Sequence, residues 1–273
     1  MSYQELWRRL AQVYEEGEAK AIARMVYETR YGLSMSDLLM GRDTDVPQDE
    51  LETIAQRLER QEPVQYVLGE ADFAGRTFLV NKHVLIPRPE TAELCQWIIN
   101  DTGGQSPCDI LDIGTGSGCI AITLAAEMPQ AKVTAWDIST EALEVARENA
   151  RRMNVQVAFE LVDALNIPLI SKHDIIVSNP PYICNKERAR MEANVLEYEP
   201  HTALFVPDDD PLLFYRAIAT YALKAFNKGG SLYFEINPLY ADSLVKMLSM
   251  MSYHDIETKE DQYGKTRMMK ARL

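Results

Sequence analysis

The sequence is poor in the residues that build metal and disulfide sites. Its cysteines are Cys95, Cys108, Cys119 and Cys184, which show no C-x-x-C spacing and lie in or beside apolar stretches. Its four histidines are equally scattered. The missing C-x-x-C spacing and the apolar surroundings of each cysteine favour buried, reduced thiols over zinc ligands or disulfides. We therefore expect no metal ion and no disulfide.

Long apolar runs are also missing. No stretch approaches the roughly 20 apolar residues of a membrane-spanning helix. The first residues include Glu5, Arg8 and Arg9, where a secretory signal peptide would have its apolar segment. We expect a cytoplasmic protein that does not associate with membranes.

Basic residues are fewer than acidic ones. The chain has 28 Lys and Arg against 41 Asp and Glu, for a formal net charge of -13. This balance excludes a sequence-wide basic field that would attract nucleic acid or an anionic membrane, but not a local basic patch. The sequence does have 273 residues, of which 47% are apolar. That is enough for one full α/β domain and a smaller partner domain.

The spacing of the apolar residues divides the chain into three parts. Over residues 1–66 they recur at helical intervals without a catalytic cluster, which predicts a helical bundle with a structural or substrate-docking role. Over residues 67–88 the period changes to two around Ala74–Arg76, which predicts a β-hairpin linker. Over residues 89–273 short apolar runs alternate with helical segments. This last pattern predicts a mostly parallel sheet covered on both faces by helices, with an antiparallel last strand.

A glycine-rich turn follows the first predicted strand of the α/β domain, residues 108–113. The turn consists of Gly114, Thr115, Gly116, Ser117 and Gly118. Glycines here let the backbone approach a ligand and leave the first amides of the next helix open. The second strand ends about twenty residues later at Asp137, where a carboxylate can accept hydrogen bonds from ribose hydroxyls. The G-x-G-x-G spacing, without the Lys-Ser/Thr of a P-loop, favours S-adenosylmethionine over a nicotinamide cofactor.

The main candidate for substrate contact is the run Asn179, Pro180, Pro181 and Tyr182 at the end of the predicted strand 173–178. The two prolines lack N–H groups and keep the chain extended, so nearby carbonyl oxygens remain free as acceptors. With the Asn179 amide oxygen and the Tyr182 ring, they suit a planar group that bears an NH₂. A side-chain amide and the exocyclic amine of a base both fit. The alternative for an isolated match is an ordinary loop after a strand.

Three further features are expected near this site. The third predicted strand, residues 155–162, ends at Asp163 and Ala164, where Asp163 either reaches an adenine amino group or caps the following turn. Arg88 is either a solvated linker charge or part of a groove between the domains. The polar stretch between Tyr182 and Pro211 is long enough to predict an unstructured loop over the active site.

With these motifs in place, the chain resembles the class I S-adenosylmethionine-dependent methyltransferases. More narrowly, it resembles the PrmC/HemK family, which methylates the glutamine of the Gly-Gly-Gln motif in class I peptide chain release factors. The resemblance covers nearly the whole length and rests on Ile86–Thr91, Asp112–Gly118 and Ser178–Ile183. The first of these segments is the most family-specific, while the Asn-Pro-Pro-Tyr motif is shared with DNA adenine and some RNA methyltransferases.

The resemblance implies a Rossmann-like sheet and assigns roles to the candidate residues. The glycine loop, Asp137, the position of Ala164 and Asn179 would contact the cofactor, together with Asp163. Residues 179–182 would hold the substrate glutamine, with Arg88 as a further substrate contact. Ala164 stands where some relatives carry a large aromatic residue, so a stacking ring is missing there.

The implied reaction transfers a methyl group from S-adenosylmethionine to the glutamine side-chain nitrogen, with S-adenosylhomocysteine as the product. The amide hydrogens would donate to the Asn179 side-chain oxygen and the Pro180 carbonyl, so no titratable base is needed before attack. We expect a monomer without direct nucleic-acid contacts. The competing hypotheses are an amino-methyltransferase for adenine or guanine in DNA or RNA, against which the acidic balance argues, and a nucleotide-sensing or scaffold protein.

Overall fold

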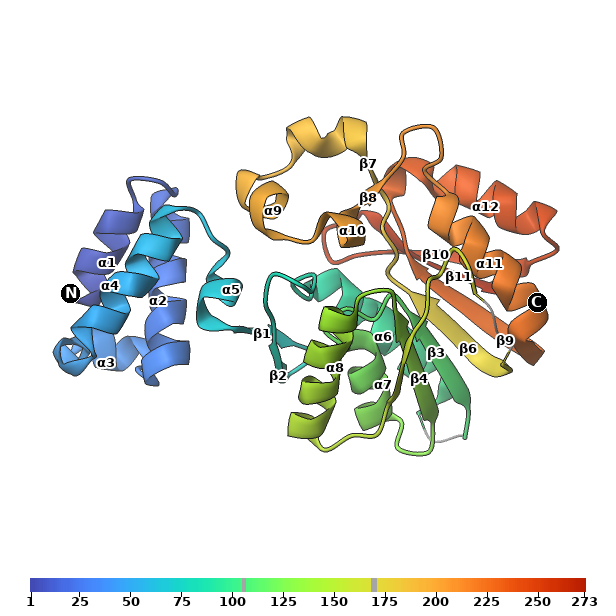
Figure 1. Cartoon of the computed structure of the whole chain (residues 1–273), viewed down its shortest axis with the longest axis horizontal. Coiled ribbons are helices and arrows are strands. Elements are labelled where there is room, and N and C mark those ends of the chain that lie inside the picture. Colours follow the sequence, from blue (N-terminus) through green and yellow to red (C-terminus); the bar gives the residue numbers. More distant parts are fainter. Residues whose placement is uncertain (105–106, 168–170) are drawn as a thin grey trace. The chain divides into compact units, whose positions relative to one another are not determined.

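Figure 1 shows the computed structural model of the chain, which describes residues 1–104, 107–167 and 171–273. Its contacts form two compact units. One comprises Met1–Glu70 with Glu192–Tyr198, and the other Ala71–Met191 with Glu199–Leu273. Within the described residues, no helix is both long and apolar enough to cross a membrane.

The first unit is helical. Its elements are α1 (Tyr3–Leu10), α2 (Glu16–Tyr31), α3 (Met35–Leu39), η1 (Arg42–Asp45), α4 (Gln48–Glu59), α5 (Val64–Leu68) and, from a distant part of the chain, α9 (Ala193–Tyr198). The Ser2 hydroxyl accepts the Glu5 amide while the Glu5 carboxylate accepts the Ser2 amide, a capping box that starts α1. The apolar stripes of α1, α2 and α4 form one buried cluster. The predicted helical bundle is confirmed.

A two-stranded hairpin follows this bundle in the chain. It consists of β1 (Glu70–Phe73) and β2 (Arg76–Leu79). Ala74 and Gly75 both have positive φ, 48° and 73°, as a two-residue turn of a twisted hairpin requires. Within the second unit, the Asn149 side chain accepts the Leu79 amide at 2.7 Å and donates to the Leu79 carbonyl at 3.0 Å.

The described part of the second unit contains a seven-stranded sheet. Its strands follow the order β10 (His254–Glu260), β11 (Thr266–Arg272), β9 (Phe226–Glu235), β6 (His173–Ser178), β3 (Asp109–Ile113), β4 (Lys132–Asp137) and β5 (Ala158–Leu161). Strand β11 runs antiparallel to β9 and β10, and the other neighbouring pairs are parallel. The mostly parallel sheet with an antiparallel last strand is therefore confirmed.

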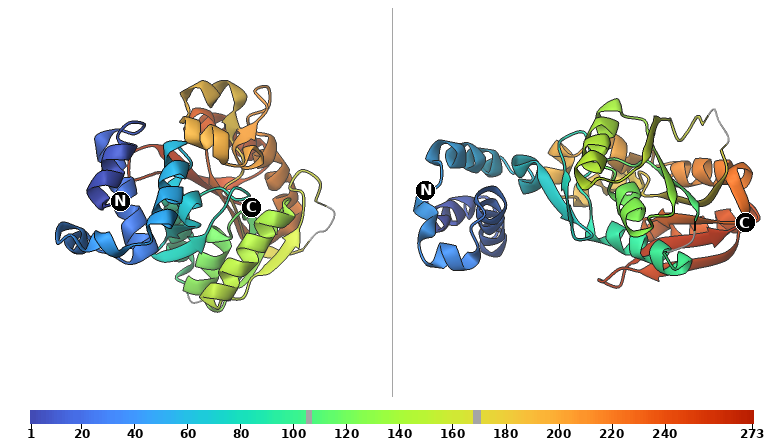
Figure 2. Two further views of the ribbon diagram at one scale, coloured as in Figure 1. Left: turned by 60° about the vertical axis from the view of Figure 1, so that its left-hand side comes forward. Right: turned by 90° about the horizontal axis from the view of Figure 1, so that it is seen from below.

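Helices cover both faces of this sheet (Figure 2). One face packs on α6 (Pro89–Thr102), α7 (Cys119–Glu127) and α8 (Thr140–Met153), and the other on α11 (Leu213–Ala225) and α12 (Ala241–Met250). Alternate residues of a strand point to opposite faces of the sheet. Ile110 of β3 therefore packs in the buried cluster with α6, α7 and α8, and Leu111 in the cluster with α11 and α12. Strands buried on both sides are rich in apolar residues, and β3 is buried from Ile110 to Ile113.

Several element bounds differ from the prediction. Strand β5 is shorter than residues 155–162, because Val155 and Val157 pack against the core outside the ladder. Gly229 and Gly230 predict a turn followed by a strand over residues 231–236, whereas β9 begins at Phe226 and includes both glycines. Gly229 has φ of 80°. The ladder between β6 and β9 changes register beside this part of the strand.

The stretch from Tyr182 to Pro211 is not unstructured, so that prediction was wrong. It contains β7 (Ile183–Cys184), η2 (Asn185–Arg190), α9, α10 (His201–Leu204) and β8 (Phe205–Val206). A further short helix, η3 (Pro238–Tyr240), lies outside this stretch, between β9 and α12. Strands β7 and β8 pair in parallel, and the Glu187 carboxylate accepts the Cys184 amide at 2.9 Å. The β7–β8 ladder pairs Ile183 with Phe205 and Cys184 with Val206, contacts across the stretch that composition alone does not reveal.

Candidate active site

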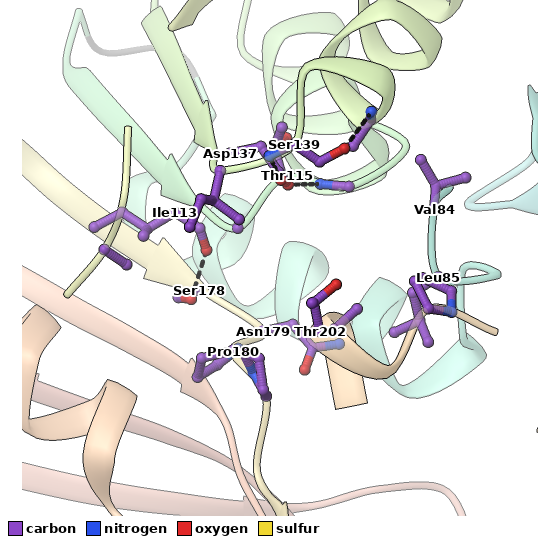
Figure 3. A pocket seen from close by; sticks show the side chains of 18 of the residues that line it. Val84, Leu85, Ile113, Thr115, Asp137, Ser139, Ser178, Asn179, Pro180 and Thr202 are labelled. Atoms are coloured by element: carbon purple, nitrogen blue, oxygen red, sulfur yellow. Dashed lines mark hydrogen bonds between the residues drawn. The ribbon is translucent and has the colours of Figure 1, made fainter. Parts of the chain in front are cut away.

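The carboxyl ends of β3, β4 and β6 border a cavity of about 390 Å³ within the second unit. Open α/β sheets bind ligands at this edge, and small-molecule sites have volumes of roughly 300 to 1,000 Å³. The predicted residues that line it are Arg88, Gly114, Thr115, Gly116, Ser117, Asp137, Asp163, Ala164, Asn179, Pro180 and Pro181. Gly118 and Tyr182 are not among the lining residues. Figure 3 shows Asp137 and Asn179 on opposite sides of the cavity.

The glycines of the loop have two different structural roles. Gly114 and Gly116 have φ of 77° and 55°, and a Cβ added at either would meet no atom within 4 Å. A side chain there would extend into open space beside the cavity. A Cβ on Gly118 would lie 2.8 Å from Ile122 Cδ1 and 3.2 Å from Ala146 Cβ. The first two glycines thus leave room for a ligand, whereas Gly118 lets α7 pack closely on α8.

Asp137 connects the glycine loop to the end of β4. One carboxylate oxygen accepts the Gly116 amide at 2.8 Å and the other accepts the Ser139 amide at 2.9 Å. Burial raises the pKa of this carboxyl, while the hydrogen bonds from Ser139 and Gly116 oppose the rise. Each oxygen keeps a lone pair for a further donor. The predicted contact with ribose hydroxyls stays a prediction.

Asp112 lies beneath the loop and was not predicted as a site residue. Its side chain is fully buried, and one oxygen accepts the Thr115 hydroxyl at 2.6 Å. Its other oxygen, Oδ1, has no hydrogen-bond partner among the described residues. Burial raises the pKa of this carboxyl to about 7, because a charge in an apolar environment is poorly solvated. The available signal was a carboxylate between the apolar residues Leu111 and Ile113.

Apolar side chains line the cavity next to the two predicted carboxylates. Ile138 follows Asp137 and is 62% exposed, and Leu165 lies two residues beyond Asp163 and is 45% exposed. Asp163 Oδ1 accepts the Leu165 amide at 2.8 Å, so this residue does cap the turn, and its second oxygen is not used in that bond. Sequence reasoning missed both apolar residues, because exposed apolar side chains are common and carry no motif.

Asn179 lies at the end of β6 with its amide fixed from behind. Its Nδ2 donates to Thr91 Oγ1 at 3.3 Å, and the Ser178 hydroxyl donates to the Ile113 carbonyl at 2.6 Å. Pro180 also faces the cavity (Figure 3). The Tyr182 ring instead packs against the core of the α11 side of the sheet. Its aromatic face is therefore not part of the cavity wall.

Arg88 lines the cavity and forms an ion pair with Glu199, whose side chain is 1% exposed. Glu199 also accepts the Ile86 amide at 3.3 Å. The segment after Glu199 contributes Thr202 and Phe205 to the cavity lining. The chain between Tyr182 and Pro211 thus borders the site as predicted, and Arg88 is a paired residue of the second unit.

The cavity has the features that a nucleoside-containing cofactor needs. Two glycine positions with open space beside them, the carboxylates of Asp137 and Asp163 and the apolar side chains of Ile138 and Leu165 line one space. Within the described ranges, no group of three or more His, Cys, Asp or Glu residues could hold a metal ion. The four cysteines are free thiols, with Cys95 and Cys184 buried.

Known proteins match both parts of the chain. The model of the methyltransferase small domain matches residues 98–198, and that of the PrmC N-terminal domain matches residues 3–69. A release factor glutamine methyltransferase from Bacteroides thetaiotaomicron is 46% identical over 267 residues, covering 96% of this chain and 95% of its own. One from Flavobacterium psychrophilum is 43% identical over 268 residues, covering 96% and 94%.

Solved structures with the same sheet are more distant in sequence. A methyltransferase from Pyrococcus furiosus has a TM-score of 0.53 and 17% identity, and the match covers 81% of this chain and 98% of that one. The 16S rRNA N2 G1207 methyltransferase of Thermus thermophilus, in complex with AdoMet and guanosine, has a TM-score of 0.52 and 17% identity, covering 74% and 49%. At such identities the likeness supports the fold alone.

Proposed function

The chain belongs to the family of release factor glutamine methyltransferases, and from that premise we propose its reaction and its site. It transfers a methyl group from S-adenosylmethionine to the side-chain amide nitrogen of the glutamine in the Gly-Gly-Gln motif of class I peptide chain release factors, and S-adenosylhomocysteine is the product. One observation carries the proposal at the level of the site: the glycine loop and the Asn179-Pro180 acceptors line the same cavity.

The residues proposed to hold the cofactor are Gly114, Thr115, Gly116, Ser117, Gly118, Asp137, Asp163, Ala164 and Asn179. When bound, S-adenosylmethionine supplies an electrophilic methyl group on a sulfonium. The open glycine positions make room for close backbone contact, and the lone pairs of Asp137 accept from ribose hydroxyls. Gly118 acts indirectly, through the packing of α7 on α8. Ile138 and Leu165 add apolar contact area in place of the aromatic ring that is missing at Ala164.

The residues proposed to hold the glutamine supply acceptors, not a base. An amide nitrogen is a poor nucleophile because its lone pair is delocalised into the carbonyl. Asn179 Oδ1 and the Pro180 carbonyl each accept one amide hydrogen, which turns the nitrogen lone pair toward the methyl group. Such alignment supplies up to roughly 7 to 11 kcal/mol in the best intramolecular reactions. Once the methyl group has been transferred, the methylated amide nitrogen releases one proton to solvent water.

We assign the remaining parts of the chain to substrate recognition. Pro181, Tyr182 and Arg88 shape the substrate side of the site, Tyr182 by supporting the motif from the core. Residues 1–66 form a docking module for the release factor, residues 67–88 a linker and residues 89–273 the methyltransferase domain. The exposed side chains of Leu39 and Met40, 81% and 68% exposed, offer this module apolar contact area. A release-factor substrate places the reaction in the cytoplasm, with the enzyme as a monomer.

The test is direct methylation of the substrate. The purified protein is incubated with radiolabelled S-adenosylmethionine and a class I release factor, beside a control in which the glutamine of the Gly-Gly-Gln motif is replaced by alanine. We expect label in the first release factor only, and mass spectrometry places it on the glutamine. Equal labelling of the control would refute the assignment. Steeply salt-dependent binding to bare RNA or DNA in a filter assay would instead favour a nucleic-acid substrate.

A further inference from the structure

A buried carboxyl lies behind the Asn179-Pro180 acceptors. Glu235 ends β9, is 2% exposed and is not one of the residues that line the cavity. Its Oε2 accepts the Thr91 hydroxyl at 2.5 Å, and its Oε1 accepts the Tyr182 hydroxyl at 3.0 Å. Thr91 belongs to α6 and is itself 3% exposed. The carboxyl therefore joins three separate parts of the chain directly behind the site.

The direction of these hydrogen bonds decides which end of the Asn179 amide faces Thr91. Both hydroxyls donate to the Glu235 carboxyl, so the single hydroxyl proton of Thr91 is used in the bond to Oε2. Thr91 Oγ1 can then only accept from a third group, and Asn179 Nδ2 donates to it at 3.3 Å. If the Asn179 amide were reversed, its Oδ1 would face the Thr91 Oγ1, and two acceptors would then meet without a proton between them. Oδ1 is thereby turned away from Thr91 and left for a group in the cavity.

We infer that Glu235 is a positioning residue for methyl transfer, because through Thr91 it keeps the Asn179 amide oxygen turned toward the substrate nitrogen. The inference rests on the proposed function, since it takes the group that Asn179 meets to be a substrate NH₂. A reversed Asn179 amide would turn its own NH₂ toward the substrate NH₂. The substrate nitrogen would then have no acceptor at this position and would lose its alignment.

Other bonds at this end of β9 hold the backbone but do not set the amide. The Tyr215 hydroxyl donates to the Glu235 backbone carbonyl at 3.1 Å, and Asn237 Nδ2 donates to the Tyr182 carbonyl at 3.1 Å. Neither reaches Thr91 or Asn179. A variant that removes the Tyr215 hydroxyl therefore perturbs the same neighbourhood and leaves the amide orientation intact.

Three variants separate these roles. Glu235→Gln keeps the shape but puts an NH₂ donor beside Thr91, whose hydroxyl can then donate to Asn179 Oδ1 and stabilise the reversed amide. Thr91→Val removes the hydroxyl at similar volume and disconnects Glu235 from Asn179. Tyr215→Phe is the matched control, because it removes a hydroxyl bond to Glu235 that lies outside this chain of bonds.

The measurement is the single-turnover rate of methyl transfer to a release factor, with cofactor affinity from calorimetry and thermal unfolding in parallel. We expect Glu235→Gln to slow transfer by about 100-fold, the effect of misplacing a reacting group by about 1 Å. Thr91→Val should slow it by about 10-fold, because the Asn179 amide then loses the partner that fixes both its position and its orientation. Cofactor affinity should change by less than about 3-fold in both, and Tyr215→Phe should transfer within about 2-fold of wild type.

The double variant Glu235→Gln/Thr91→Val gives the decisive comparison. Without the Thr91 hydroxyl the glutamine cannot reverse Asn179, so the double variant should be as fast as Thr91→Val and about 10-fold faster than Glu235→Gln. Rate losses that multiply would show two independent effects and overturn the inference. A wild-type rate in Glu235→Gln would do the same. If Glu235→Gln does not fold, Thr91→Val decides alone, and an unchanged rate there rejects the inference.

The pH profile adds a readout that a merely structural role would not move. Burial raises the pKa of Glu235. The charged or titratable groups that interact with it are Tyr182, Arg267 of β11, Glu90 and Cys95 of α6, Cys119 of α7 and Tyr215 of α11. Protonated Glu235 can donate to Thr91 as glutamine does, so wild-type transfer should fall as the pH is lowered through that pKa. Thr91→Val should lack this fall, and its persistence there would contradict the inference.

Failure of this inference and failure of the proposed function give different results. If the wild-type protein does not label the glutamine of a release factor, the proposed function fails before any variant is compared. If the wild type labels it and Glu235→Gln labels it equally fast, only the positioning role of Glu235 fails.

Discussion

The buried carboxyl of Asp112 should make the second unit less stable as the pH rises toward neutrality. In the folded protein its pKa is about 7, raised from 3.8 by burial. Between about pH 4 and pH 7 the folded state therefore keeps a proton that the unfolded state has lost, and raising the pH lowers the free energy of unfolding. A shift of about three pKa units at 1.36 kcal/mol each amounts to about 4 kcal/mol. Below pH 4 both states hold the proton, and above pH 7 neither does.

The assay is urea unfolding of the wild type and Asp112→Asn between pH 4 and pH 8. Trp97 and Trp136 are buried in the second unit, so tryptophan fluorescence in a Trp7→Phe background reports on that unit alone. Relative to Asp112→Asn, the wild type should lose about 4 kcal/mol of unfolding free energy across this window.

A variant without the Thr115 hydroxyl gives a second test of the same pKa shift. The hydrogen bond from this hydroxyl favours the charged carboxyl and lowers the pKa of Asp112. Thr115→Val should therefore extend the pH window upward. A difference in unfolding free energy between wild type and Asp112→Asn that does not vary with pH would refute the reasoning.

The other predictions concern the ligand contacts. Asn179→Ala should lower single-turnover methyl transfer by about 100-fold through lost alignment while cofactor affinity by calorimetry changes little, and preserved turnover would remove Asn179 from its role. Asp137→Ala should weaken cofactor binding by about 10- to 100-fold, since hydrogen bonds to a charged group contribute roughly 1.5 to 3 kcal/mol, and unchanged affinity would exclude it from the site. Gly116→Ala should reduce cofactor affinity more than Gly118→Ala, because only the first adds a Cβ beside the cavity. Gly118→Ala should lower the thermal unfolding temperature more, through its contacts with neighbouring helices, and the opposite ranking would contradict the division of roles among the glycines.

Local chemistry in the sequence was sufficient to predict the fold and part of the cavity lining, namely its glycines, its carboxylates and the Asn179-Pro180-Pro181 run. The strand before Gly114, the strand before Asp137 and the strand before Asn179 each follow from a short apolar run that ends in a recognisable turn. Parallel strands in an open sheet bring their carboxyl ends to one edge, so the order of motifs along the chain already predicted that they share a site. The two prolines after Asn179 set their own backbone and need no distant partner to do so.

Only the tertiary structure decided how those residues are held and which way they face. Thr91 and Glu235, which form a hydrogen bond, are 144 residues apart in sequence, and the ion pair of Arg88 and Glu199 spans 111 residues. No local sequence pattern predicts either interaction. The direction of the Tyr182 ring also depends on the distant core that it packs against. A hydrogen bond between side chains forms wherever folding brings a donor to an acceptor, independently of their sequence separation. Residue types and turn signals are properties of the sequence, whereas amide orientation, burial and the pKa values that follow from them exist only in the folded chain.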